Sequence, residues 1–301
     1  MELAKEVIEK YIKSGKILQE ALKLAEKTAK PDTPLLKIAE EIESFIIKKN
    51  AFPAFPVNIS INNAAAHDTP SLNDSRVLKK NDIAKIDIGV HIDGCITDSA
   101  VTVNPNKEHE KLMQASKDAL EEAMIKVNEF ASLHNIGETI ENKIKEFGFK
   151  PIENLSGHGI LSFVCHAPPT IPNVPINDPN TLGEGVYAVE PFATTAGNNR
   201  VHEESRNEIY SFNEKKPVRN PIARKLIGLA ENEFFGIPFA ERWIYKHTDS
   251  SEFVVKSALR ELLKVKALNS YPVLSVSNGS FVSQAETSFL IDADDKVRRL
   301  V

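Results

Sequence analysis

The fold of this chain is decided by the segment Ala84-Lys85-Ile86-Asp87-Ile88-Gly89-Val90-His91-Ile92-Asp93-Gly94-Cys95-Ile96-Thr97-Asp98. Apolar and polar residues alternate on both sides of Asp93-Gly94, and Asp-Gly favours a two-residue type I′ turn, so the segment predicts an antiparallel hairpin. In this register Asp98 lies opposite Gly89, two residues along from Asp87. Both carboxylates therefore share one face, with Cα atoms roughly 7–8 Å apart. Carboxylates this close can bind one divalent ion, or two ions about 3.5–4 Å apart.

Composition describes a folded protein with no general affinity for nucleic acid or membranes. Hydrophobic residues form 42% of the 301-residue chain, and the net charge is −5, so a sizeable core is available without a basic surface. No apolar run approaches the roughly 20 residues that span a bilayer. The two cysteines give no disulfide framework, and the N-terminus lacks a secretory signal pattern. We therefore expect a cytoplasmic protein with no membrane partner and no direct nucleic-acid binding, and we expect a monomer.

Apolar spacing predicts secondary structure on both sides of the hairpin. The predicted helices are residues 2–29 (one or two helices), 35–49, 108–130 and 136–147, and the predicted strands are 57–61, 186–195, 280–291 and 296–301. Helices and strands alternate around an antiparallel hairpin, which is typical of an α+β fold with helices on one face of a curved sheet.

Between Glu204 and Leu274 the pattern changes to helices with few strand signals. We expect an inserted helical subdomain over residues 204–273, and a main domain formed by residues 1–203 and 274–301. The helices predicted inside the insertion are residues 221–232, 238–245 and 252–267.

Three more candidate metal ligands follow the hairpin, namely His158, Glu190 and Glu286. With Asp87 and Asp98 they make four carboxylates and one imidazole, a set suited to Mn²⁺, Fe²⁺, Co²⁺ or Zn²⁺. Four negative charges cannot pack together without cations, so a converging set binds metal or has strongly shifted pKa values. Taken alone, the two aspartates are also typical of the polar face of a half-exposed hairpin, and the metal hypothesis depends on convergence.

Five strings surround or accompany these residues: Asn62-Asn63-Ala64-Ala65-Ala66-His67, Leu155-Ser156-Gly157-His158-Gly159-Ile160, His166 to Asn173, Ala188-Val189-Glu190-Pro191-Phe192 and Ser283-Gln284-Ala285-Glu286-Thr287. In motif order, spacing and neighbours they resemble the methionine aminopeptidases, and the resemblance covers nearly the whole chain. The long helical stretch before the last motif points to the type 2 subfamily.

The resemblance implies the pita-bread fold of the creatinases and aminopeptidases, in which a curved antiparallel sheet surrounds a dinuclear metal site. It implies that a metal-generated hydroxide attacks the first peptide bond and removes the initiator methionine from the N-terminal peptide of nascent proteins. The ribosome is a further expected partner. The implied cofactor is a pair of divalent ions of cobalt, manganese, iron or zinc, held by Asp87, Asp98, His158, Glu190 and Glu286, with Asp98 and Glu286 bridging.

Further roles also come from the resemblance. Glu190 is the implied proton carrier, His67 contacts the scissile amide, and His166 donates to the substrate carbonyl oxygen. Phe55 matches a pocket aromatic of the family, and we expect Cys165 and the region of Phe192 to be wall residues. Aromatic and sulfur-containing walls suit the flexible, polarisable methionine side chain.

Two departures from the family pattern bear on the site. After His166 and Ala167 the chain has Pro168-Pro169, where the family usually has a glycine after the alanine, so the position of His166 is expected to differ. Ala285 and Thr287 flank Glu286 in place of an aromatic residue and a histidine, which predicts a roomier pocket.

Two other functions remain open from the sequence. A prolidase-like or aminopeptidase P-like peptidase shares the five-ligand pattern, although those relatives usually carry a large N-terminal domain. A non-catalytic binding protein of the same fold is the second alternative, and retention of all five candidate ligands argues against it.

Overall fold

The predicted hairpin is confirmed. In the computed structural model, which describes residues 4–301, β4 (Ala84–Ile92) and β5 (Cys95–Val103) pair antiparallel with Asp98 opposite Gly89. Asp93 and Gly94 have φ values of 49° and 83°, and positive φ at both turn residues is what a type I′ turn requires.

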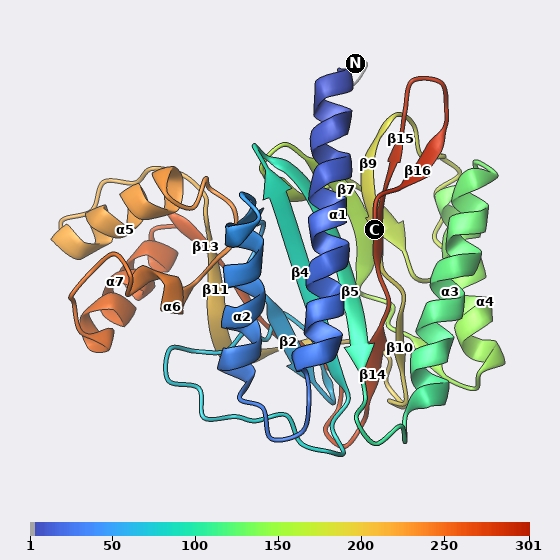
Figure 1. Ribbon diagram of the computed structural model, residues 1–301, viewed down its shortest axis with the longest axis horizontal. Coiled ribbons are helices and arrows are strands. Elements are labelled where there is room, and N and C mark those ends of the chain that lie inside the picture. Colours follow the sequence, from blue (N-terminus) through green and yellow to red (C-terminus); the bar gives the residue numbers. More distant parts are fainter. Residues whose placement is uncertain (1–3) are drawn as a thin grey trace.

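The hairpin is part of a curved system of antiparallel strands (Figure 1). The other strands are β1 (Phe52–Pro53), β2 (Asn58–Ile61), β3 (Ala64–Ala66), β6 (Lys150–Pro151), β7 (Ser156–Leu161), β8 (Val164–Pro172), β9 (Gly185–Val189), β10 (Phe192–Thr194), β11 (His202–Phe212), β12 (Phe239–Ala240), β13 (Leu268–Ser275), β14 (Val282–Gln284), β15 (Thr287–Ile291) and β16 (Val297–Arg299). One sheet has the order β1-β4-β2, with β5 on β4, and another has the order β16-β15-β9-β7-β8. Smaller sheets have the orders β14-β10-β6 and β12-β11-β13-β3.

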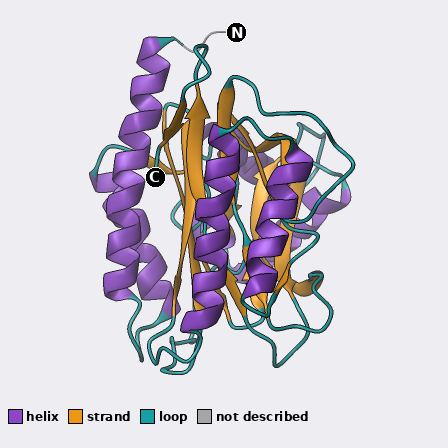
Figure 2. Cartoon of the chain, turned by 90° about the vertical axis from the view of Figure 1, so that its right-hand side faces the viewer, coloured by secondary structure: helices purple, strands orange, loops and turns teal. Residues whose placement is uncertain are grey.

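Two pairs of helices flank the strands (Figures 1 and 2). The first pair is α1 (Lys5–Thr28) and α2 (Leu35–Lys48), which share an apolar core with β2 and β4. The second pair is α3 (Glu110–Asn128) and α4 (Leu133–Glu146), which share a core with β9 and β15. The repetition of a helix pair on antiparallel strands gives the two halves of the expected pita-bread fold. Residues 2 and 3 of the first predicted helix lie outside the described residues.

The predicted insertion contains α5 (Pro221–Asn232), α6 (Glu241–Ile244) and α7 (Glu252–Lys264), which build a separate apolar core beside α2 (Figure 1). The prediction of few strands between residues 204 and 273 is wrong at both ends, because β11 and β13 are long paired strands. The first seven residues of β11 are polar and at least partly exposed, so no apolar alternation marks it. The helix predicted over 238–245 is instead the short β12 followed by one helical turn. Within residues 4–301, no helix combines the length and apolarity that crossing a membrane would require.

Two strands predicted as continuous are each broken in the middle. The predicted strand 186–195 is β9 and β10, separated at Glu190-Pro191, and the predicted strand 280–291 is β14 and β15, separated at Ala285-Glu286. Because proline has no N–H to donate, Pro191 favours an interruption of the ladder. Both breaks fall at predicted metal ligands.

Candidate metal centre and active site

The five predicted metal ligands line one cavity of about 200 Å³, which we call the central cavity. Asp87 and Asp98 project from the hairpin, and His158 comes from β7. The Nε2 atom of His158 lies 3.8 Å from Asp98 Oδ2 and 3.9 Å from Glu190 Oε1. One ligand atom each from Asp98, His158 and Glu286 lie within 4.8 Å of one another. The structure therefore brings together groups separated by up to 199 positions, the difference between 87 and 286.

The two glutamates reach the cavity because their strand pairs break at the same level. β9 pairs with β15 and β10 pairs with β14, while Glu190-Pro191 and Ala285-Glu286 lie between these two ladders. The Ala285 N–H donates to the Pro191 carbonyl oxygen at 3.2 Å, which joins the two breaks. This local interruption positions both carboxylates at the centre of the curved sheet.

The carboxylates form a buried acidic cluster with few donors. Burial raises the pKa of Asp87 to about 7. It also raises the pKa values of Asp98, Glu190 and Glu286 well above their ordinary range, and repulsion among the carboxylates adds to the effect. Oδ1 of Asp87 and Oδ1 of Asp98 are buried without a hydrogen-bond partner among the described residues. Such oxygens suit divalent cations, which would permit all four groups to ionise.

Gln284 is a site residue that the sequence reasoning missed. Its Nε2 donates to Glu190 Oε2 at 3.4 Å and to Glu286 Oε2 at 3.3 Å. Gln284, the last residue of β14, thus connects the two glutamates that lie at the strand breaks. Gln284 lies two positions before Glu286 in the same matching string, but an amide at that distance from a carboxylate is not a recognisable site pattern.

His158 has the protonation state of a metal ligand. Its Nδ1 donates to the Gly159 carbonyl oxygen at 3.1 Å, which leaves the Nε2 lone pair facing the carboxylates. Burial lowers the pKa of His158 to about 3, so the ring is neutral at neutral pH.

The two histidines predicted to contact substrate also line the central cavity. Burial lowers the pKa of His67 to about 4, and its Nδ1 has no hydrogen-bond partner among the described residues. The ring of His166 lies 4.5 Å from that of His158 between centroids. Tyr271 is 5.6 Å from the His67 ring and 6.4 Å from the His166 ring. This tyrosine from β13 was missed, because the sequence showed no strand there.

The predicted pocket residues divide into two groups. Phe55 and Phe192 line the central cavity, together with Ile209 and Pro238, which the sequence reasoning did not identify. The prediction that Cys165 is a wall residue is wrong. Cys165 is buried behind the wall, and its Sγ donates to the Ala54 carbonyl oxygen at 3.4 Å. Neighbouring residues of a strand point to opposite faces, so Cys165 and His166 cannot both face the cavity.

The residues that depart from the family pattern lie outside the lining of the central cavity. Pro168 and Pro169 lie in a bulge of β8. His158 pairs with Thr170 and its neighbour Gly159 pairs with Ala167, so the two prolines between them have no partner on β7. His166 consequently stays beside His158. Ala285 and Thr287, the basis of the expected roomier pocket, are not lining residues of the central cavity. Ala285 packs in the core with residues of α3, and Thr287 Oγ1 donates to the Val301 carbonyl oxygen at 2.7 Å.

Comparisons with known proteins identify relatives of this chain. Residues 9–221 match the model of metallopeptidase family M24. The chain is 44% identical to a methionine aminopeptidase of Archaeoglobus fulgidus, over 95% of this chain and 96% of the relative. It is 43% identical to one of Pyrococcus horikoshii, over 95% and 97%.

Solved structures share the fold. A thermophilic Arx1 superposes with a TM-score of 0.86 at 18% identity, over 99% of this chain and 91% of that chain. The methionine aminopeptidase of Thermotoga maritima superposes with a TM-score of 0.70 at 20% identity, over 100% and 98%. From the family match and the full-length relatives, this chain belongs to metallopeptidase family M24.

Proposed function

We propose that the chain removes N-terminal methionine from peptides, with two divalent metal ions held in the central cavity. The observation that carries the proposal is the meeting of four carboxylates, two buried and two half-buried, and a neutral imidazole in one cavity that two further histidines line. The methionine aminopeptidase relatives, which match nearly the full chain, support the substrate.

Each ligand has a proposed place at the metal pair. Asp87 would hold one ion, His158 and Glu190 the other, and Asp98 and Glu286 would contact both. Cobalt, manganese, iron and zinc all accept this mixture of carboxylate and imidazole. When bound, such ions lower the pKa of water toward about 7 and so supply a hydroxide nucleophile near neutral pH.

The side chains around the ions divide the remaining work. Glu190 has a raised pKa, so it is suited to take a proton from water and deliver it to the leaving amine. His166 would donate to the substrate carbonyl oxygen as negative charge develops, and His67 would contact the scissile amide. Loss of one hydrogen-bond donor to a developing oxyanion, the role proposed for His166, typically lowers kcat about 10²–10³-fold.

The walls favour one apolar side chain. Phe55, Phe192, Ile209, Pro238 and Tyr271 surround the cavity. An unbranched thioether adapts to such a mixture of aromatic and aliphatic surfaces. A cavity of about 200 Å³ is of the size that one amino-acid side chain occupies.

The physiological setting is a finer part of the proposal. The substrate would be the initiator methionine of nascent proteins in the cytoplasm, with the enzyme as a monomer and the ribosome as a further partner. Two buried, unpaired cysteines suit a reducing compartment. The helices between β11 and β13 would act as an inserted subdomain at the rim of the cavity.

Hydrolysis of Met-Ala-Ser by protein loaded separately with Mn²⁺, Co²⁺, Fe²⁺ or Zn²⁺ tests this function. We expect turnover with at least one ion, none after chelation, and about two ions per chain by metal analysis. Asp98→Ala should abolish turnover and leave the circular dichroism spectrum unchanged. Hydrolysis that survives this change contradicts the mechanism, and faster cleavage of Xaa-Pro dipeptides would favour the prolidase-like alternative.

A further inference from the structure

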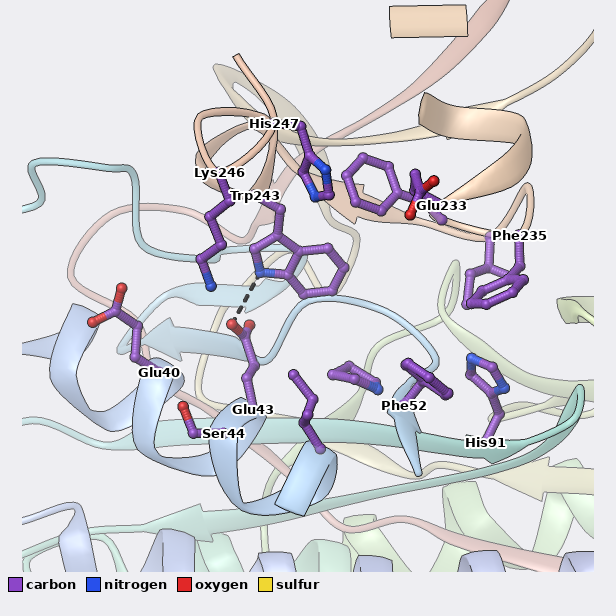
Figure 3. Close-up of a pocket in the computed structure, with 14 residues that line it drawn as sticks. Glu40, Glu43, Ser44, Phe52, His91, Glu233, Phe235, Trp243, Lys246 and His247 are labelled. Atoms are coloured by element: carbon purple, nitrogen blue, oxygen red, sulfur yellow. Dashed lines mark hydrogen bonds between the residues drawn. The ribbon is translucent and has the colours of Figure 1, made fainter. Parts of the chain in front are cut away.

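A second cavity, of about 470 Å³, lies between α2 and the inserted helices (Figure 3). We call it the insertion cavity. Ile47 and Phe52 line it from the side of α2 and β1, and Phe234, Phe235 and Trp243 line it from the insertion. None of these residues belongs to the proposed metal or substrate site, so the cavity has no role in the chemistry described above.

Aromatic rings form much of the lining of the insertion cavity. Phe52, His91 and Phe235 form a triangle in which each pair of ring centroids is 5.6 Å apart. Phe52 and Phe235 are nevertheless 48% and 41% exposed. Open aromatic faces attract cations, because the face of an aromatic ring carries partial negative charge.

His91 adds a directional polar group. Its side chain is only 1% exposed and lines the cavity, with the ring pointing toward the space between Phe52 and Phe235 (Figure 3). The Nδ1 atom accepts a hydrogen bond from the Gly94 N–H at 3.3 Å, so the proton of the neutral ring is on Nε2. Nε2 has no partner among the described residues. A buried N–H donor in this state favours a ligand that supplies an acceptor.

The charges at the rim are mainly negative. Glu40 and Glu233 are exposed lining residues that form no ion pair within residues 4–301, and Lys246 is the one lysine or arginine among the lining residues. The deeper Glu43 is already compensated, because Arg242 donates to its Oε1 and Trp243 Nε1 donates to its Oε2 at 3.0 Å. The free charge that a ligand meets is therefore negative.

We propose that the insertion cavity binds a peptide segment in which a cationic side chain neighbours an aromatic one. The aromatic ring would stack among Phe52, Phe235 and Trp243, the cation would meet Glu40 and Glu233, and a peptide carbonyl would accept from His91 Nε2. The aromatic lining matches the ring of the ligand, and the negative rim matches its cation. The unpartnered Nε2 of His91 matches a peptide carbonyl oxygen.

The insertion cavity shares two walls with the central cavity. Residues 52–55 present Phe52 to the insertion cavity and Phe55 to the central one. Likewise Ile237 lines the insertion cavity, and Pro238 lines the central cavity. A ligand that orders these walls from behind will improve the fit of the methionine side chain. This coupling rests on the proposed function, whereas binding itself does not.

Trp243 allows binding to be measured directly, because it is the one tryptophan of the chain and lines the insertion cavity. The probe is N-acetyl-Arg-Phe-amide, whose blocked amine prevents it from acting as an aminopeptidase substrate. Titration into the full chain should change the tryptophan fluorescence to saturation, with a Kd of the order of 1 mM or below, typical of a small weakly bound ligand. N-acetyl-Glu-Phe-amide should bind at least about tenfold more weakly, since it reverses the charge at the rim.

Variants locate the site. Glu40→Gln and Glu233→Gln should each weaken probe binding about threefold, as expected for exposed ion pairs. His91→Phe keeps a stacking ring without the donor and should weaken binding about fivefold. The matched control is Glu41→Gln on the same helix, because Glu41 pairs with Lys37 and does not line the cavity. Equal binding of the acidic probe, an unsaturable signal, or an equal effect of Glu41→Gln would overturn the site.

The second readout separates coupling from binding. With metal-loaded protein, saturating probe should lower KM for Met-Ala-Ser about fivefold, the lower end of typical coupling between sites, and leave kcat within about twofold. An unchanged KM with saturated fluorescence would refute the coupling. An inactive enzyme that still binds the probe would contradict the proposed function and not the insertion-cavity site.

Discussion

The hydroxyl of Ser288 holds the backbone of Asp98 from two sides: it accepts from the Asp98 N–H and donates to the Asp98 carbonyl oxygen, both at 2.7 Å. β5 and β15 belong to different sheets, so no backbone ladder joins them here. Ser99 Oγ similarly donates to the Glu286 carbonyl oxygen at 2.6 Å. Side-chain hydroxyls thus connect the two halves of the fold where Asp98 and Glu286 must meet.

Ser288→Ala removes this connection and leaves a buried N–H and a buried carbonyl oxygen unpaired. The free energy of unfolding should fall by about 1–3 kcal/mol, measured by urea denaturation of the metal-free protein. Metal affinity, measured by calorimetry, should also fall because Asp98 is less firmly held. Ser277→Ala is the control, since its contact with Ser280 is exposed. Unchanged metal affinity would show that the hydroxyl does not position the ligand.

Arg76→Lys should impair turnover through His67. Arg76 donates to both carboxylate oxygens of Asp68, at 2.7 and 2.9 Å. Asp68 is the residue that follows His67 in the sequence, and His67 has a φ of 64°, in the left-handed region. Lysine keeps the charge but cannot form this two-pronged contact. We expect kcat to fall about tenfold or more, as for a misplaced catalytic group, with metal content unchanged. The control is Arg224→Lys, a change at an exposed arginine, which should leave kcat unchanged. If Arg76→Lys loses metal together with activity, the proposed role of Arg76 in positioning His67 is contradicted.

Gly89→Ala should weaken substrate binding. A Cβ atom at this position would lie 2.3 Å from Cε1 of Phe55 and 2.9 Å from the Cβ of Ala54, so the Phe55 ring must move. KM for Met-Ala-Ser is expected to rise several-fold, with little change in metal content. Gly183→Ala serves as the comparison, because nothing lies within 4 Å of its added Cβ. If KM is the same in both variants, Phe55 does not shape the substrate pocket.

The metal-free protein should lose stability as the pH rises from about 6.5 to 8. The pKa of Asp87 is raised to about 7 and those of its carboxylate neighbours are raised as well, so the folded protein binds more protons than the unfolded chain in this range. Proton release then costs the folded state free energy as the pH increases. His67 and His158 have lowered pKa values and act in the opposite direction, mainly below their ordinary pKa of 6.5. Burial also lowers the pKa of Lys85 to about 7, which opposes the fall within this range, but one lysine is outweighed by the four carboxylates.

Calorimetric Tm values in the presence of a chelator test this sign. Tm should fall between pH 6.5 and 8 for the metal-free protein, and Asp98→Asn should reduce the slope by removing one ionising group. Metal-loaded protein should lack the decline, because the cations stabilise the ionised carboxylates. A metal-free Tm that rises across this range would refute the acidic cluster as a source of instability.

The local parts of the fold followed from the sequence by itself. An Asp-Gly turn between alternating strands determines its own register, and this placed Asp87 and Asp98 on one face. The helix pairs followed from apolar spacing within a single segment. The site histidines and glutamates were identified by the motifs around them, which are also local strings.

Only the tertiary structure decided which side chains face the central cavity. The breaks beside Glu190 and Glu286 depend on strands that pair across about a hundred residues. Tyr271 reaches the site on β13, whose sequence has no regular alternation and includes Pro272. Cys165 faces away because the register of β8 directs His166 inward. Long-range pairing and strand facing arise from contacts between distant segments, and periodicity within one segment contains no information about them.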